Sequence, residues 1–413
     1  TLQYFAKKAI EKNPGVSSDP VWKIIWYDSA LKAELSPALP LSRYFDDIGI
    51  VAAKSGWDET ARAVFFKCGF YGGKKLNALK GKAYADVGSD FPDQNSFALY
   101  NGGTFTAEEH ADAKQKMTEQ FNSIIVDGKG QLEEGDKWVL PLEPGKGGRI
   151  YSEFSAFGTS LVSGSAGTCY QDLLKFTRTF AHVNGEYTVI LDILADDKPH
   201  KYEWRLNKAG QWTKSSENKY VVSQGAGALN IQFLLPANVT GSIIKSGNAQ
   251  QGLSASSDIV DKAQFFAVLV PGEIYVLVKD IRYFDNISCF GAVVEKEDFA
   301  DTVMFQRVGD EIRTDTFRGW GDFFLVTAQK STGQWKRLTG ISARSAVLNN
   351  IRQFHSSQPV NFGIIRDENG IEVVLGIGTR RGDFSRPDTI DVQNRTEYNR
   401  ADKSAPTRQY EIS

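Results

Sequence analysis

The sequence contains few cysteines and few histidines, the residues that form disulfides and imidazole- or thiolate-based metal sites. Among 413 residues there are three cysteines and four histidines. Cys68, Cys169 and Cys289 lie far apart without the spacing of a metal site, so at most one intramolecular disulfide is expected. The histidines form no His-x-His or His-Glu-x-x-His pattern, so an imidazole-rich metal site would have to be assembled from distant segments.

Strong charge and long apolar runs are also missing. The net charge is −2 and the isoelectric point is about 6.2, so the chain has no general positive field that would attract nucleic acid. The longest apolar run, AQFFAVLV before EIYVLV, is interrupted at Pro271-Gly272 and is too short to span a bilayer. We therefore predict no nucleic-acid partner and no membrane span, and we expect this run to form a hairpin.

The dominant pattern is the two-residue period of β-strands. It begins near Leu41 and continues through many short segments separated by Gly, Asn, Asp and Pro. The dipeptides Asn184-Gly185 and Asn369-Gly370 predict tight hairpins. Because no helices alternate with the strands, we predict a mainly β fold built around a large antiparallel sandwich rather than a parallel α/β sheet.

Four segments follow from this pattern. Residues 1–38 contain the one convincing helical periodicity, and residues 39–300 are expected to form the large sandwich. Residues 301–380 are expected to form a smaller C-terminal β domain, and residues 381–413 a polar tail of mixed charge. The aromatic share of 12% permits a carbohydrate partner without requiring one.

The stretch from Tyr84 to Gln131 is typical of a loop-built site on a β scaffold, because polar turns surround two short strands. Inside this stretch, four potential cation ligands lie within a span of five residues: Glu108, Glu109, His110 and Asp112. The same residues also suit the first turns of a short helix capped by Thr106. The residues favour the capped helix, and the two interpretations are compatible.

Two other histidines are expected to be structural. His182 lies in TRTFAHVNGEY, on a predicted strand, where a packing role is favoured over a functional one. His200 precedes the strand that contains Trp204, and packing is again favoured over contact with a sugar.

Four blocks of sequence carry a resemblance to a known family. They are LPLSRYFDDIGIVAAKSGWDETARAVFFKCGFYGG, PDQNSFALYNGG, NSIIVDGKGQ and FTRTFAHVNGEYTVILDILADDKPHKYEWRLN. In this order they resemble the heparinase II/III-like polysaccharide lyases over roughly residues 40–210. The resemblance implies an N-terminal (α/α) toroid, a large antiparallel β super-sandwich and a smaller C-terminal β domain. Residues 1–38 would then be the last helices of the toroid, most of which this sequence lacks.

The resemblance also implies a reaction. These lyases cleave polysaccharides that contain uronic acid by β-elimination, which needs a base, an acid and neutralisation of the uronate carboxylate. The base Tyr and the neutralising Asn or His come mainly from the toroid. The sandwich adds a His-x-His motif and metal ligands, which bind zinc or calcium. The implied partners are an acidic polysaccharide and a toroid supplied by a separate chain, or by self-assembly.

The family positions can be carried over to this sequence. The catalytic His position is Ser89, and the three metal positions are Phe91, Glu109 and Phe121, with His110 beside Glu109. Neighbouring residues match the family pattern, which implies catalytic roles for Asp93 and Asn95. It likewise implies substrate-binding roles for three residues: Tyr84, Gln94 and Asn122.

These positions predict a degenerate site. Phe has no lone pair for a metal, and Ser cannot replace an imidazole base near neutral pH. We therefore expect no cofactor, and whether the chain is an enzyme stays open. One hypothesis is a lyase sandwich, and the alternative is a non-catalytic glycan-binding or structural subunit of an extracellular assembly. An unrelated β-sandwich binding module is disfavoured, because the four blocks occur in the family's order.

The sequence gives some indication of the compartment. It begins at Thr1 without a Met or signal peptide, so we expect a processed protein or a fragment. Three glycosylation triplets, at Asn238, Asn286 and Asn394, fit a secreted protein. With the family resemblance, they predict a secreted, periplasmic or extracellular location.

Overall fold

A computed structural model describes residues 39–376 and 390–391. Within the first range it leaves out residues 59, 79–89, 102, 110–114, 136–145, 226, 238, 247–249, 273–276, 308, 310 and 368–369. The chain forms two compact units, Thr1–Leu41 and Ser42–Ser413, and the strands belong to the second. The expected toroid helices at 1–38 lie outside the described residues, as does the expected tail apart from residues 390–391.

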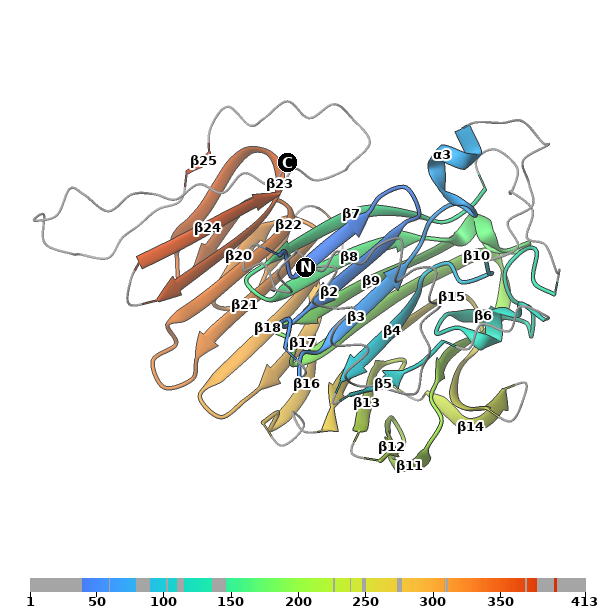
Figure 1. Cartoon of the computed structure of the whole chain (residues 1–413). Helices are drawn as coiled ribbons and strands as arrows, with labels where there is room; N and C mark the ends of the chain where they lie inside the picture. The colour runs from blue at the N-terminus through green and yellow to red at the C-terminus, as the bar shows by residue number, and fades with distance from the viewer. Residues whose placement is uncertain are drawn as a thin grey trace, which may run out of the picture. The chain divides into compact units, whose positions relative to one another are not determined.

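The described strands form three antiparallel sheets (Figure 1). The first sheet, blue to cyan in Figure 1, follows the order of the chain. Its strands are β1 (Ser42–Phe45), β2 (Ile50–Lys54), β3 (Ala63–Lys67), β4 (Ser96–Asn101) and β5 (Thr104–Ala107).

The second sheet is built around two long strands, β10 (Tyr187–Asn207) and β15 (Gln250–Pro271), which pair with each other. On the β10 side follow β9 (Lys175–Val183), β8 (Thr159–Ser165) and β7 (Arg149–Ala156), while β6 (Ile124–Val126) pairs with the far end of β10. On the β15 side follow β13 (Gly227–Leu235), β12 (Lys219–Gln224) and β11 (Gln211–Ser216), and β14 (Thr240–Ser246) pairs with β15.

The third sheet, orange to red in Figure 1, begins at residue 280. Its main order is β16 (Asp280–Asp285), β17 (Cys289–Glu295), β18 (Phe299–Gln306), β21 (Phe323–Gln329), β22 (Trp335–Leu348), β20 (Phe317–Trp320) and β19 (Glu311–Arg313). A further strand, β23 (Ile351–Asp367), pairs with β22, β24 (Gly370–Gly376) and β25 (Ile390–Asp391).

The second sheet is buried on both faces. Successive residues of β10 contribute to two different apolar cores, with Ile190 in the core shared with the first sheet and Leu191 in the core shared with the third. Since side chains alternate along a strand, a strand between two cores must be apolar at nearly every position. This explains the run AQFFAVLV in β15, of which Phe265 faces the first core and Phe266 the second.

The hairpin expected at Pro271-Gly272 is wrong. Both edges of β15 are already occupied, because Leu269 pairs with Thr188 of β10 on one side and with Ile231 of β13 on the other. The C-terminal end of β15 therefore has no free edge for a hairpin partner, and residues 273–276 lie outside the described part. The next described strand, β16, pairs with β17 in the third sheet.

The hairpins expected at the two Asn-Gly dipeptides are confirmed. Strands β9 and β10 pair from Val183 and Tyr187, and Asn184 and Gly185 have φ angles of 56° and 68°. Strands β23 and β24 pair from Asp367 and Gly370. Positive φ at both central residues gives the turn a twist that matches the strands, which Asn and Gly tolerate.

The helix expected from Thr106 does not start there. Thr106 lies in β5, and its hydroxyl donates a hydrogen bond to the carbonyl of Leu99 at 3.4 Å. Glu108 then forms a β-bridge with Asn207 of the second sheet. Pairing with distant strands has overridden the local helix signals, and residues 110–114 lie outside the described part. The described helices are short: α3 (Gly73–Ala78) and the 3-10 turns η2 (Thr118–Gln120) and η3 (Gly167–Cys169).

The expected mainly β, antiparallel super-sandwich is confirmed. The boundary expected between residues 300 and 301 stays a prediction; the third sheet starts earlier, at Asp280, and shares an apolar core with the second. All three cysteines are buried and free. Across the described residues, no helix has the length and apolar character that a bilayer crossing needs.

Candidate functional site

The first sheet presents a lysine and a serine side by side. Lys67 at the end of β3 is the cross-strand partner of Ser96 at the start of β4. Their neighbours Phe66 and Phe97, also partners, face the core shared with the second sheet. Because side chains alternate along a strand, Lys67 and Ser96 lie together on the opposite face of the sheet.

Two carboxyl groups join this pair. One carboxylate oxygen of Asp93 lies 3.7 Å from the ammonium nitrogen of Lys67, and each of the two side chains is 13% exposed. Burial raises the pKa of Asp93 to about 6, although the Lys67 charge opposes the shift. Burial likewise raises the pKa of Glu109 to about 7, partly opposed by the neighbouring Ser96 hydroxyl. We refer to Lys67, Asp93, Ser96 and Glu109 as the Lys67 cluster.

The Lys67 ammonium stays charged in this setting. Burial lowers the pKa of Lys67, but the carboxylates of Asp93 and Asp90 outweigh that effect and leave the pKa raised. The cluster therefore combines a fixed positive charge with two acids that change protonation near neutral pH. Such sets of shifted groups are typical of sites that transfer protons.

Three polar atoms of the Lys67 cluster lack hydrogen-bond partners among the described residues. They are Lys67 Nζ, Ser96 Oγ and Glu109 Oε1, and each is buried. Buried polar atoms in folded proteins are nearly always paired, and exceptions mark bound water, ions or functional groups. The Lys67 cluster is therefore the best candidate site that the described residues provide.

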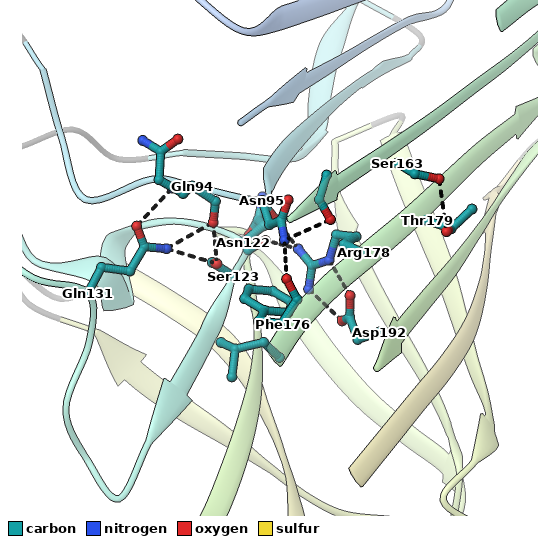
Figure 2. A network of polar contacts seen from close by, with 12 residues as sticks. Gln94, Asn95, Asn122, Ser123, Gln131, Ser163, Phe176, Arg178, Thr179 and Asp192 are labelled. Carbon is teal, nitrogen blue, oxygen red and sulfur yellow. Dashed lines mark hydrogen bonds and ion pairs between the residues drawn. The ribbon is translucent and has the colours of Figure 1, made fainter. Parts of the chain in front are cut away.

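A glutamine clamp holds the segment that carries Asp93 and Ser96 (Figure 2). The Gln131 side chain accepts a hydrogen bond from the Gln94 backbone N–H at 2.9 Å and donates one to the Gln94 carbonyl at 2.8 Å. Gln94 in turn accepts a bond from the Gly69 N–H at 2.6 Å and donates one to Asp93 at 2.9 Å. The clamp thus sets the position of the Asp93 carboxylate.

A buried ion pair supports the same segment. Arg178 of β9 donates two hydrogen bonds of 2.7 Å to Asp192 of β10, and both side chains are fully buried (Figure 2). The same guanidinium donates to the carbonyls of Asn95 and Asn122, at 2.6 and 2.5 Å. Arg178 therefore connects the segment that carries Asp93 and Ser96 to the second sheet.

The predicted residues Gln94, Asn95 and Asn122 lie together in this network, and each is fully buried. The Asn122 amide donates to the carbonyls of Phe97 and Glu108, and the Asn95 amide donates to two carbonyls of the second sheet. These side chains bind backbone groups of the protein itself. Their assignment to catalysis or substrate binding stays a prediction.

Phe91 and Phe121, at two of the positions where the family has metal ligands, lie against each other. Their ring centroids are 5.6 Å apart. The ammonium of Lys116, a fully buried residue, lies 5.2 Å from the Phe91 ring centroid, within the range of a cation–π contact. These two sequence-based positions therefore meet in space, as an apolar pair with a cation beside it.

The described donors do not fit the divalent metal that the resemblance implies. Phenylalanine rings offer no lone pair, and a lysine ammonium beside them repels a cation. The described part of the chain holds no group of three or more His, Cys, Asp or Glu side chains placed to bind a metal. Ser89, Tyr84 and His110 lie outside the described residues, so the expected lack of a cofactor stays a prediction.

Sequence reasoning missed Lys67, Ser96, Gln131 and the Arg178–Asp192 pair. One signal was available for the pair. On β9, Arg178 lies two residues from both Phe176 and Phe180, so its side chain points to the same face, toward the core. On β10, Asp192 lies between Ile190 and Leu194 in the same way. Two opposite charges on the apolar faces of adjacent strands predict a buried ion pair.

His182 and His200 are both buried, and neither joins the Lys67 cluster. His182 forms a hydrogen bond of 3.0 Å with Thr188. His200 contacts two carboxylates, Asp127 at 2.7 Å and Asp196 at 3.0 Å. The sequence predicts only a packing role for His200, whereas the structure shows contacts of its imidazole with two carboxylates.

Comparison with solved structures finds partial matches to this chain. Among solved structures, a heparinase III gene product is 12% identical with a TM-score of 0.49, over 74% of this chain and 48% of its own. A heparan sulfate lyase HepC from Pedobacter heparinus is also 12% identical with a TM-score of 0.46, over 81% of this chain and 47% of its own. The chain thus spans about half the length of these proteins. No curated protein sequence gives a significant match.

The family comparison is the decisive one. The family model described as "Heparinase II/III-like, C-terminal" matches residues 38–262, which is more than half of the chain. That range includes the first sheet, the Lys67 cluster and both strands of the Arg178–Asp192 pair. The chain belongs to the heparinase II/III-like family, whose C-terminal domain it contains.

Proposed function

We propose that this chain forms the β-sandwich side of a polysaccharide lyase that acts on uronic-acid-containing polysaccharide by β-elimination. Family membership supports the reaction class. The observation that carries the proposal is the buried Lys67 cluster, in which two carboxyl groups with pKa values of about 6 and 7 lie near the Lys67 ammonium.

The chemistry of the Lys67 cluster suits this reaction. β-Elimination removes the proton next to a carboxylate and passes through an enolate-like state, so it needs positive charge near the carboxylate and groups that exchange protons near pH 7. In the proposed site, Lys67 supplies the charge. Glu109, poised near neutrality, gives or takes a proton, and Asp93 keeps Lys67 protonated.

The proposal includes a toroid that faces this wall and supplies the Tyr base. The toroid comes either from a preceding segment of the same protein or from a separate chain. An acidic polysaccharide then lies between the two parts. Such substrates occur outside the cytoplasm, so the proposal includes a secreted, periplasmic or extracellular location.

The test is a lyase assay on the native protein together with any toroid partner. Heparin, alginate, ulvan and chondroitin are each incubated with it, while ultraviolet absorbance reports unsaturated uronate. We expect product from one of these polysaccharides, and a loss of about 10²–10⁴-fold in kcat for Glu109→Gln, the size typical of a lost acid or base. Glu217→Gln, at an exposed position, is the matched control. No product from any substrate, with the toroid present, would contradict the proposal.

The contact between Phe91 and Phe121 favours a second candidate, a non-catalytic glycan-binding or structural subunit with degenerate His positions. In this alternative the site has kept its shape and lost its metal, and the Lys116 charge lies beside the two rings. Elemental analysis of the purified protein separates the two cases further. A stoichiometric divalent metal would contradict the degenerate site, and glycan binding without product would support the second candidate.

A further inference from the structure

The third sheet contains a hairpin that folds back on itself. Strands β22 and β23 pair from Leu348 and Ile351 at the tip to Arg337 and Ile365 at the base. The register shifts between Gly340 and Ala343, where Ser342 has a φ of 51°. Beyond this bend, β22 pairs with β20 instead of β21.

Ring stacking confirms that the two halves of this hairpin are in contact. Phe354 and Phe362 both belong to β23, yet their ring centroids lie 3.8 Å apart at an interplanar angle of 15°. A straight strand would separate residues eight positions apart by about 26 Å. The bend therefore brings the tip of the hairpin close to its base.

A cavity of about 170 Å³ lies where the tip meets the base. The base contributes Gln334, Trp335 and Arg366, and the tip contributes Asn349 and Gln353. The lining contains amides, apolar groups and one cation, and it includes no carboxylate. Pockets for drug-sized ligands measure about 300–1,000 Å³, so this cavity suits a single small group.

Arg366 is held in this cavity by an aromatic ring and an amide. Its guanidinium carbon lies 4.3 Å from the Trp335 ring centroid, and one terminal nitrogen donates a hydrogen bond of 3.5 Å to Gln353 Oε1. Gln353 is itself 5% exposed and fixed by its bond to the Ile351 carbonyl. The guanidinium is therefore preorganised before any ligand arrives.

The charge of Arg366 is not balanced in the described part of the chain. Its Nε is buried without a hydrogen-bond partner among the described residues, and burial, not a carboxylate, is what shifts its pKa. Burial lowers the pKa of Arg366, because the guanidinium loses part of its hydration in this cavity and no nearby negative charge compensates for the loss. An unpaired, partly buried cation is unfavourable unless an anion binds to it.

Two other arginines of the third sheet show the usual arrangement. Arg318 lies 4.6 Å from the Trp320 ring centroid and also pairs with Glu311. Arg307 lies 5.2 Å from the Phe290 ring centroid and also pairs with Asp285. Arg366 has the same kind of aromatic contact but no carboxylate partner among the described residues. The N–H groups of its guanidinium are therefore available to bind an oxyanion.

We propose that the cavity around Arg366 binds the anionic group, carboxylate or sulfate, of an acidic sugar. Arg366 forms charge-assisted hydrogen bonds to the oxyanion, while the neutral amides of Gln334 and Asn349 contact sugar hydroxyls. The choice of a sugar rests on the proposed lyase function. The site lies on the third sheet, apart from the Lys67 cluster of the first sheet, and would anchor a polysaccharide at a second place.

The test is a ligand-observed NMR titration of the full chain at low ionic strength with D-glucuronate, D-glucose 6-sulfate and D-glucose. We expect binding of one or both anionic sugars and none of glucose. The stronger of the two identifies the preferred anion. Arg366→Gln should weaken this binding about tenfold or more, as expected for the loss of a hydrogen bond to a charged group.

Two further variants keep the test decisive. Arg318→Gln removes a matched arginine that already has a carboxylate partner, and binding should be unchanged. Gln353→Glu places a carboxylate beside Arg366 in a cavity of nearly the same shape, and it should abolish binding without loss of fold. Wild-type affinity in Arg366→Gln or Gln353→Glu, or an equal loss in Arg318→Gln, would overturn the inference. So would a lack of binding by both anionic sugars.

Failure of this inference is distinguishable from failure of the lyase proposal. The titration reads binding at Arg366, whereas the ultraviolet assay reads elimination at the Lys67 cluster. A chain without lyase activity that binds glucuronate through Arg366 would contradict the lyase proposal alone.

Discussion

The guanidinium of Arg178 and the carboxylate of Asp192 form two hydrogen bonds of 2.7 Å in a place without solvent exposure. The pair connects adjacent strands of the second sheet, and Arg178 also holds the carbonyls of Asn95 and Asn122. The segment that carries Asp93 and Ser96 is thus fastened to the second sheet, which is buried on both faces. Rigid support of this kind is what a site needs to keep its groups in place.

The first prediction concerns this pair. Arg178→Met leaves the Asp192 charge buried and unpaired, so we expect a loss of about 3–5 kcal/mol in the free energy of unfolding. Urea denaturation measures it. The double variant Arg178→Met with Asp192→Leu should lose less, because no unpaired charge remains.

An exposed ion pair provides the control for Arg178. Arg282 pairs with Glu295 at the surface, and Arg282→Met should cost about 0–1 kcal/mol. If Arg178→Met cost no more than Arg282→Met, the buried pair would not be the fastening that we describe.

The second prediction concerns Glu109. Its pKa in the folded protein is about 7, above the usual 4.5, so between these values the folded state binds the proton more tightly than the unfolded state. The stability of the wild type should therefore fall as the pH rises from about 4.5 to about 7. Glu109→Gln removes this loss, and at pH 8 it should gain about 1–3 kcal/mol relative to its effect at pH 4.5.

Urea unfolding at both pH values gives the comparison for Glu109. Asp93 titrates over part of the same range in both proteins, so the difference between the two curves is the quantity to examine. Parallel curves for wild type and Glu109→Gln would show that Glu109 is not buried as an acid. Glu217→Gln, at an exposed position, should leave the slope unchanged.

The third prediction concerns His200. Hydrogen bonds to Asp127 and then Asp196 raise the pKa of His200, while burial opposes them. A raised folded pKa means that the stabilisation is fully present below about pH 6.5 and is lost as the pH rises through the folded value. Wild-type stability should therefore decline over this range more steeply than that of His200→Gln.

Further contacts hold His200 and its partner Asp127 in place, and an exposed histidine provides a control for the pH dependence of stability. Asp127 also accepts a hydrogen bond from the Lys201 N–H, and the Tyr202 ring lies 6.1 Å from the imidazole. His355 is exposed, and His355→Gln should keep the wild-type slope. Equal slopes for wild type and His200→Gln would refute the prediction.

The fourth prediction concerns the Gln131 clamp. Gln131→Leu removes one hydrogen bond from each backbone group of Gln94. The Ser123 hydroxyl still donates to the Gln94 carbonyl, but the Gln94 N–H is left buried without a partner, so we expect a loss of about 1–3 kcal/mol in the free energy of unfolding. Hydrogen exchange should accelerate at the Gln94 amide before it does in β10. Gln211→Leu, at an exposed position, is the control. Unchanged protection at Gln94 would rule out the clamp.

Much of the fold was predictable because it depends on local physics. The turn at Asn184-Gly185 is determined by which residues tolerate a positive φ, and the strands by a two-residue period. The sequence blocks also led to the family and to the convergence of Phe91 with Phe121. The helix at Thr106 and the hairpin at Pro271 were wrong, because pairing with distant strands outweighed local preference.

The sequence by itself determined the fold class, the family and the segment that carries the candidate site. The tertiary structure alone decided which groups of that segment lie at the candidate site, and it added Lys67 from outside the segment. Lys67 and Ser96 are far apart in the chain and meet only through strand register, and Gln94, Asn95 and Asn122 proved to hold the backbone. Burial decides the protonation of Asp93 and Glu109, and burial arises from segments that meet only in the folded chain.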